Sequence, residues 1–335
     1  MCVCVCVQPL KNDRWRIPKS RYASNSTYIS QDPRLRKEYL DPNLIVDEEL
    51  KKRLIEGGMD ELLATHFAHL FIRDPIVIFA EDLQELNLNA VDHFENLQST
   101  NWQHMRFKPP PPDKDTGWRV EFRAMEVQMT DFENAAFAIF IVLVTRAILS
   151  FDLNFYIPIT LTTENMETAH ARNAVLEKKF YFRKDPFPSR RARLQQQTNG
   201  DAPVSSGSAD AASGASSPVL GPVEDEYRLM TIAEIINGAP GGFPGLIPLV
   251  ESYLNSVNVD VETRCSIARY LDLLRKRADG TLWTGARWLR HFVTSRPDYK
   301  GDSVVSEKIT YDLVKAVQEM TEKEGKDGTA GWQML

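Results

Sequence analysis

A two-residue alternation of charged and apolar side chains, interrupted by a proline run, dominates residues 101–128. The charged positions are His104, Arg106, Lys108, Arg119, Glu121 and Arg123, and the apolar positions are Met105, Phe107, Trp118, Val120, Phe122 and Ala124. Side chains of a strand point alternately to opposite faces, so this pattern predicts two strands with one charged and one apolar face. Residues 109–117, with four prolines and a glycine, predict the connection between them. We therefore expect a hairpin whose apolar face packs against helices.

The expected charged face groups Arg106, Lys108, Arg119 and Arg123 around a single carboxylate, Glu121. Arginine makes planar, two-pronged contacts with phosphate oxygens, and lysine adds a point charge. Mg²⁺ binds through one or two carboxylates together with substrate phosphates, which a lone glutamate among cations suits. The pattern alone leaves two interpretations open, a phosphate and metal site or an exposed hairpin covered by salt bridges.

The remaining pattern predicts an α+β fold with a helical C-terminal part. Helices are expected over residues 48–56, 60–74, 131–150, 165–179, 248–255, 262–276, 283–292 and 306–322, and a strand over 155–161. Asp47, Asp60 and Asp260 are placed to cap three of the helices. Residues 92–98 show no clear period, and the glycine- and proline-rich residues 238–245 predict a plain loop.

Two further segments differ from this pattern. Residues 189–223 consist mainly of Gln, Ser, Ala, Gly and Pro, which predicts a disordered low-complexity insertion. Residues 135–144 are an unbroken apolar run, but Asp131, Glu133 and Arg146 limit its length. About 18 uninterrupted apolar residues are needed to cross a bilayer, so we interpret the run as a buried core helix and expect no membrane partner.

Composition and isolated motifs narrow the function. The chain of 335 residues has 43% hydrophobic and 26% charged residues and a net charge of −6, which argues against a nucleic-acid partner. Three of the four cysteines lie in the opening Met1–Val7 segment, and Cys265 is expected in the core, so we expect a reducing, cytoplasmic location. His66 and His69 are expected to pack rather than to bind metal. There is no Walker loop and no dinucleotide glycine fingerprint.

Several strings in the sequence resemble the eukaryotic glutamate–cysteine ligase catalytic subunit. They include Ser20-Arg21-Tyr22, Asp92-His93-Phe94-Glu95-Asn96, Met105-Arg106-Phe107-Lys108-Pro109-Pro110, Gly117-Trp118-Arg119-Val120-Glu121-Phe122-Arg123 and Phe243-Pro244-Gly245-Leu246-Ile247-Pro248. The resemblance extends in order over about residues 9–320 and is interrupted mainly by the low-complexity insertion. It implies ATP, L-glutamate, L-cysteine and Mg²⁺ as ligands, γ-glutamyl phosphate as intermediate and a place at the start of glutathione biosynthesis. It also implies an antiparallel sheet similar to that of glutamine synthetase.

The resemblance also implies roles for single residues. Glu121 would bind Mg²⁺, Arg123 would lie beside the transferring phosphoryl group, and Arg21 would hold the substrate glutamate. Strand geometry assigns Arg106 and Lys108 to nucleotide phosphates, and Arg119 has no assigned role.

Only the later part of that subunit is represented, so we expect a truncated chain with an incomplete site. Residues 1–8 form an atypical end, 9–188 the later part of the catalytic domain, 224–322 a helical region and 323–335 a tail, with the insertion at 189–223. The acidic Mg²⁺ ligands of the family's earlier part are missing from this sequence. Two hypotheses follow: a ligase by descent, and a non-catalytic remnant that binds a modifier subunit through its C-terminal helices.

Overall fold

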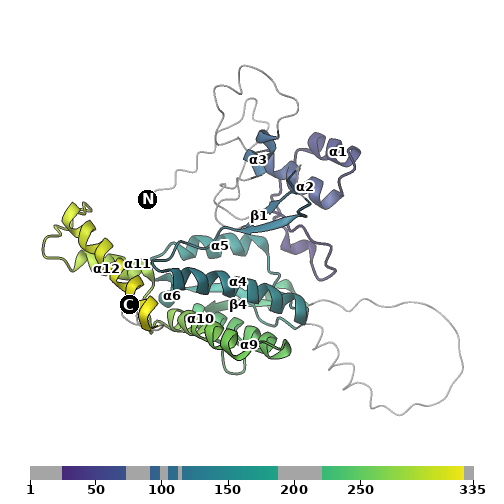
Figure 1. The fold of residues 1–335 in the computed structure, drawn as a ribbon. Helices are drawn as coiled ribbons and strands as arrows, with labels where there is room; N and C mark the ends of the chain where they lie inside the picture. The colour runs from purple at the N-terminus through teal and green to yellow at the C-terminus, as the bar shows by residue number, and fades with distance from the viewer. Residues whose placement is uncertain (1–24, 73–90, 99–104, 112–114, 188–220, 328–335) are drawn as a thin grey trace, which may run out of the picture. The chain divides into compact units, whose positions relative to one another are not determined.

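The computed structural model describes residues 25–72, 91–98, 105–111, 115–187 and 221–327 (Figure 1). The chain divides into two compact units: residues 1–126 with 156–167, and residues 127–155 with 168–335. Among its described residues, each unit combines helices with one small antiparallel sheet. The expected mixture of helix and sheet is confirmed.

The first unit begins with a short 3₁₀ turn, η1 (Lys37–Tyr39), and two capped helices, α1 (Glu48–Glu56) and α2 (Glu61–Leu70). The side chains of Asp47 and Asp60 accept hydrogen bonds from the backbone N–H groups three residues later, so both expected caps are confirmed. All the buried residues of this helix pair lie on α2, since α1 has none. The two histidines of α2 are both buried, and His69 Nδ1 lies 2.7 Å from the carbonyl oxygen of Ile45.

The predicted hairpin is present in the first unit. Strands β1 (Met105–Lys108) and β2 (Arg119–Phe122) pair antiparallel, with Arg106 opposite Glu121 and Phe107 opposite Val120. The pairing and the two faces agree with the alternation, although the strands are shorter than the alternating pattern. The apolar face is covered only in part. Trp118 stacks on Phe107 with ring centroids 4.7 Å apart, yet nearly half of the Trp118 surface is exposed.

One local prediction in this unit is wrong, and one helix had no prediction. Residues 92–98, for which the sequence shows no clear period, form a helix, α3 (Asp92–Gln98), whose seven residues are too few to reveal a helical period. Residues 155–161 do not form a strand. Instead the chain is irregular up to Pro158 and then enters α5 (Ile159–Ala169). Proline cannot donate a ladder hydrogen bond but fits readily at the start of a helix, which explains the outcome.

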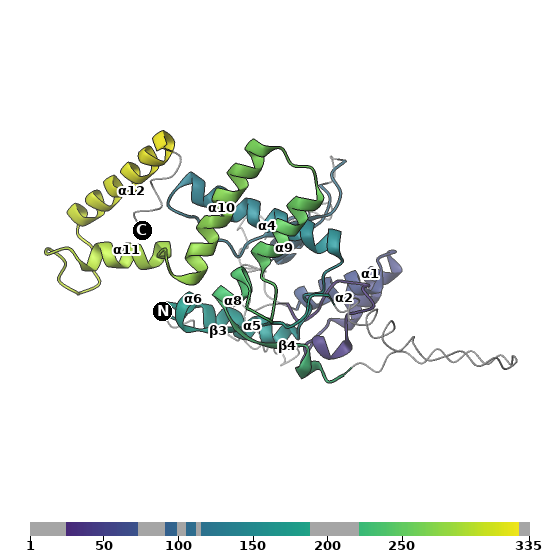
Figure 2. The same cartoon turned by 90° about the horizontal axis from the view of Figure 1, so that it is seen from below.

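The second unit is built on α4 (Asp131–Phe151), which packs against α9 (Leu246–Ser256) and α10 (Val261–Asp279) (Figures 1 and 2). A capping box of Thr130 and Glu133 begins α4. Buried residues from these three helices form one apolar cluster, which includes Phe140, Ile247, Val250 and Leu271. The long helix predicted for residues 131–150 is therefore confirmed.

The prediction that α4 is buried is wrong for most of its surface. Only Glu133, Ala136, Phe140 and Ala147 are buried, because α9 and α10 cover one side of the helix. Among the described helices, α4 alone is long and apolar enough to cross a membrane, and one such helix is weak evidence for a membrane protein.

A second hairpin completes this unit and was not predicted. Strand β3 (Lys179–Arg183) pairs antiparallel with β4 (Tyr227–Thr231). The helix expected over 165–179 is not continuous, because α5 ends at Ala169 and a separate short helix, α6 (Ala174–Glu177), follows it. Phe180 and Met230 of this hairpin are buried in a cluster with Phe243. A 3₁₀ turn, η3 (Val223–Asp225), precedes β4, and α8 (Ile232–Asn237) follows it. The expected loop at 238–245 is confirmed.

The C-terminal helices agree with the predictions. Asp260 caps α10, Gly280 ends it in the left-handed region, and α11 (Gly285–Thr294) and α12 (Glu307–Asp327) follow. The prediction that Cys265 is buried is wrong, since its thiol is free and its side chain exposed. The buried residues of α10, among them Leu271 and Leu273, all lie in its second half, which leaves the first turns uncovered.

Candidate functional site

The charged face of the first hairpin centres on the carboxylate of Glu121. Its Oε1 accepts a hydrogen bond from Arg123 Nε at 2.8 Å. Its Oε2 lies 3.4 Å from Lys108 Nζ and 4.0 Å from Arg106 Nη1. The structure thus brings three of the four expected cations, Arg106, Lys108 and Arg123, around the Glu121 carboxylate.

These contacts change the acidity of Glu121. The hydrogen bond from Arg123 is the largest cause that holds the pKa of the Glu121 carboxyl below its ordinary value of 4.5. Burial, the next largest, opposes it, and the charge of Arg123 and the hydrogen bond and charge of Lys108 lower the pKa further. Glu121 is therefore ionised at neutral pH. Both of its oxygens face cations, so the same cations could also contact a phosphate bound beside Glu121.

Arg106 is the most buried cation of this face, with 9% of its surface exposed. Its Nη2 donates to Oε2 of Glu95 at 2.7 Å, and Glu95 lies on α3. The expectation of a single acid on this face is therefore wrong. Glu95 belongs to one of the strings that carry the family resemblance, but its contact with the hairpin depends on α3, which the periodicity did not reveal.

Lys108 and Arg123 are the cations best placed to reach an added anion. About a third of the Lys108 side chain and a fifth of the Arg123 side chain are exposed. Arg119 instead uses its Nη2 to donate to the carbonyl oxygen of Pro109 at 3.2 Å, which fixes the start of the connection between the strands. Arg21 and His104 lie outside the described residues.

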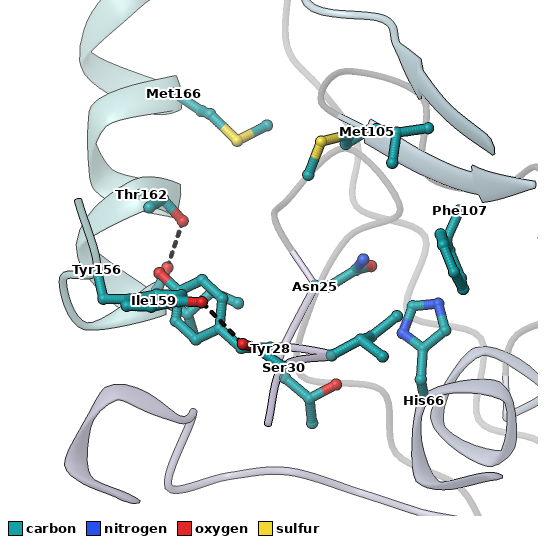
Figure 3. Close-up of a pocket in the computed structure, with 13 residues that line it drawn as sticks. Asn25, Tyr28, Ser30, His66, Met105, Phe107, Tyr156, Ile159, Thr162 and Met166 are labelled. Atoms are coloured by element: carbon teal, nitrogen blue, oxygen red, sulfur yellow. Dashed lines mark hydrogen bonds between the residues drawn. The ribbon is translucent and has the colours of Figure 1, made fainter. Parts of the chain in front are cut away.

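A pocket of about 440 Å³ lies on the opposite, apolar face of the same hairpin (Figure 3). Met105, Phe107 and Val120 line it from the strands, and Thr162 and Met166 line it from α5. Tyr156 and Ser30 meet at its edge, with their hydroxyl oxygens 2.8 Å apart. None of the described residues that line it is Asp, Glu, Lys or Arg. The pocket is thus unsuited to phosphate.

Comparison with known proteins connects this hairpin to a family. The profile of the glutamate–cysteine ligase family matches residues 5–320. The chain belongs to this family. It is 67% identical to the glutamate–cysteine ligase of Neurospora crassa over 333 residues, 95% of this chain and 46% of that protein. It is 51% identical to the glutamate–cysteine ligase catalytic subunit of Mus musculus over 308 residues, 92% of this chain and 45% of that protein.

The family resemblance drawn from the sequence strings is therefore confirmed. A third relative, the glutamate–cysteine ligase of Schizosaccharomyces pombe, is 47% identical over 317 residues and is covered to 43% of its length. The chain thus spans about half the length of the glutamate–cysteine ligases it matches. Among its described residues, no group of three or more His, Cys, Asp or Glu side chains is arranged to hold a metal ion.

Proposed function

We propose that the charged hairpin is the phosphoryl-transfer part of a glutamate–cysteine ligase site. The observation that supports this most directly is the Glu121 carboxylate held between Arg123 and Lys108 in a chain of this family. The reaction would join L-glutamate to L-cysteine with ATP, giving γ-glutamylcysteine, ADP and phosphate, the first step of glutathione biosynthesis.

The proposed chemistry has two steps. An oxygen of the glutamate γ-carboxylate attacks the γ-phosphorus of ATP, the bond from phosphorus to the ADP oxygen breaks, and γ-glutamyl phosphate forms. The cysteine amine then attacks the γ-carbonyl carbon, loses a proton, and phosphate leaves. Negative charge is spread over the phosphoryl oxygens during the first step, so a preorganised cation beside them lowers the barrier. Arg123 takes this role in the proposal.

The other residues bind and orient. Lys108 and Arg106 contact nucleotide phosphates, and Arg21, on the strength of the resemblance, holds the substrate glutamate. Glu121 fits as one carboxylate ligand of Mg²⁺ that is bound together with substrate phosphates. It does not fit as the whole metal site, because one carboxylate is too few for a cage made of protein groups alone. Mg²⁺, when bound, would neutralise phosphate charge.

The architecture around the hairpin is also a proposal. We infer that β1 and β2 form part of an antiparallel sheet similar to that of glutamine synthetase. We also infer that the enzyme is cytoplasmic and that the low-complexity insertion at 189–223 separates the catalytic part from the helical region. An isolated two-stranded hairpin has marginal stability, which further strands beside it would relieve.

Activity of a joined protein tests the proposal. The first half of the Neurospora crassa relative would be fused to this chain, and γ-glutamylcysteine would be measured with ATP, Mg²⁺, glutamate and cysteine. We expect turnover by the fusion and none by the 335-residue chain alone. In the fusion, Glu121→Ala should abolish turnover without loss of folding. Full activity of that variant would remove Glu121 from the site, and turnover by the unfused chain would refute the incomplete-site hypothesis.

A further inference from the structure

We propose that Glu95 is a positioning residue that fixes the guanidinium of Arg106 for contact with nucleotide phosphate. The inference rests on the proposed function, since it concerns the same charged face. Glu95 lies on α3 and was not among the residues expected at the site. Its carboxylate is nevertheless in direct contact with the most buried cation there.

The geometry holds Arg106 from two sides. Nη2 donates to Glu95 Oε2 at 2.7 Å, and Nη1 lies 4.0 Å from Glu121 Oε2. The guanidinium is planar and its donors are fixed relative to one another, so a contact at one nitrogen sets the direction of the others. Glu95 therefore directs the Nη1 edge of Arg106 toward the carboxylate at the centre of the charged face.

Fixing this side chain in advance favours ligand binding. A free arginine side chain samples many rotamers, and ordering it when a ligand binds costs conformational entropy. In this hairpin the cost has already been met in the folded chain, because Arg106 is almost fully buried and paired. Phosphate that reaches Nη1 thus meets an oriented donor.

Helix α3 does not depend on Glu95 alone for its place beside the hairpin. The Gln98 side-chain amide donates to the carbonyl oxygen of Phe107. The ring of Phe94 packs against Phe67 of α2, with centroids 5.0 Å apart. Substitution of Glu95 therefore leaves two other anchors in place, and its variants are expected to fold.

The alternative to positioning is charge masking, in which the Glu95 carboxylate neutralises Arg106 and weakens anion binding. Two substitutions separate positioning from masking. Glu95→Asp keeps the charge but shortens the side chain by one methylene, which withdraws the carboxylate from Arg106. Glu95→Gln keeps the length but removes the charge. Positioning predicts weaker phosphate binding for Asp and little change for Gln, because the Gln side-chain oxygen can still accept from Arg106, whereas masking predicts no loss for Asp and tighter binding for Gln.

The experiment titrates the whole chain with tripolyphosphate and with ATP by calorimetry, at fixed ionic strength and without divalent ions. Glu95→Asp should weaken binding about 3- to 10-fold, and Glu95→Gln should change it by less than about 2-fold. In an Arg106→Gln background, Glu95→Asp should cause no further loss. The matched control is Glu61→Gln, which removes an exposed partner of Lys51 in the same unit and should leave the affinity unchanged. Thermal unfolding confirms that each variant is folded.

Each result decides between the alternatives. Unchanged affinity for Glu95→Asp, tighter binding for Glu95→Gln, or an equal loss in the Arg106→Gln background overturns the positioning role while leaving the phosphate face intact. Absence of tripolyphosphate binding by the unsubstituted chain overturns the assignment of Arg106 to nucleotide phosphate, and the inference with it, whereas turnover of the fusion tests the proposed function separately.

Discussion

Arg123 Nε donates a 2.8 Å hydrogen bond to Glu121 Oε1, two residues earlier in the chain. The proposed phosphoryl-binding cation and the proposed metal ligand are thus paired with each other. A phosphate group that approaches Arg123 would compete with Glu121, and a cation that approaches Glu121 would compete with Arg123. If the phosphate and the metal ion bind together, Arg123 and Glu121 each gain a new partner as they lose one another. This agrees with a nucleotide that enters together with its metal ion.

The contact between Arg123 and Glu121 has a measurable consequence for acidity. The pKa of Glu121 is held below its ordinary value of 4.5, and the hydrogen bond from Arg123 is the largest cause. A carboxyl whose pKa is depressed by folding stabilises the folded state above its unfolded pKa, and this contribution is lost as pH falls through the folded pKa. We expect the Glu121 side-chain carbon signal to titrate below 4.5 in NMR.

Two substitutions control this titration. Arg123→Ala should return the Glu121 midpoint toward the ordinary value, and Lys108→Ala should raise it by less, since Lys108 is the smaller cause. A Glu121 midpoint that stays unchanged in Arg123→Ala would contradict the assigned cause.

Substitution of Arg123 and of Arg119 should lower the kcat of the fused ligase to different extents. Arg123→Gln removes the cation that we propose lies beside the transferring phosphoryl group, so we expect kcat to fall about 10²- to 10³-fold. Arg119→Gln is the matched control on the same face, because Arg119 donates to the Pro109 carbonyl oxygen. Its loss should remain below about tenfold. Steady-state rates of γ-glutamylcysteine formation measure both, and equal losses would show that general positive charge is sufficient.

The ion pair between Glu133 of α4 and Arg277 of α10 should be important for the stability of the second unit. Glu133 is fully buried, and its other oxygen accepts hydrogen bonds from the backbone N–H groups of Met129 and Thr130 at the start of α4. Glu133→Gln leaves Arg277 buried without its counter-charge. Removal of one partner of a buried pair costs about 3–5 kcal/mol of unfolding free energy, measured by urea denaturation.

The exposed pair of Glu251 and Arg275 is the control for that experiment, since it also joins α10 to a neighbouring helix, with its atoms 3.0 Å apart. Glu251→Gln should change the free energy of unfolding by less than about 1 kcal/mol. Similar losses at the two sites would show that burial of the Glu133 pair does not determine its contribution.

The success of the sequence predictions depended on how local the signal was. The hairpin around Glu121 was predicted correctly because alternation on two adjacent segments determines both faces. The partner of β3 was not found, because Arg183 pairs with Tyr227 across the long insertion and no local pattern specifies that register. Glu95 was missed for a related reason. Its contact with Arg106 depends on the packing of a seven-residue helix, and short helices give no readable period.

The glycines at the two ends of the loop between α8 and α9 give a final test of the fold. Gly238 and Gly245 both have φ of +92°, and their backbones are in contact. A Cβ on Gly245 would lie 2.5 Å from the Gly238 nitrogen, and one on Gly238 would lie 2.5 Å from the Pro244 oxygen. Alanine at either position combines an unfavourable φ with a backbone clash, so we expect losses of more than about 2 kcal/mol in unfolding free energy.

Gly241→Ala separates the cost of the φ angle from the cost of the clash. Gly241 has φ of +69°, and a Cβ added there would have no atom of the described residues within 4 Å. Gly241→Ala should therefore lower the free energy of unfolding by only about 1 kcal/mol, which is the cost of the φ angle alone. Equal losses at positions 241 and 245 in urea denaturation would show that the contact between Gly238 and Gly245 does not constrain the loop.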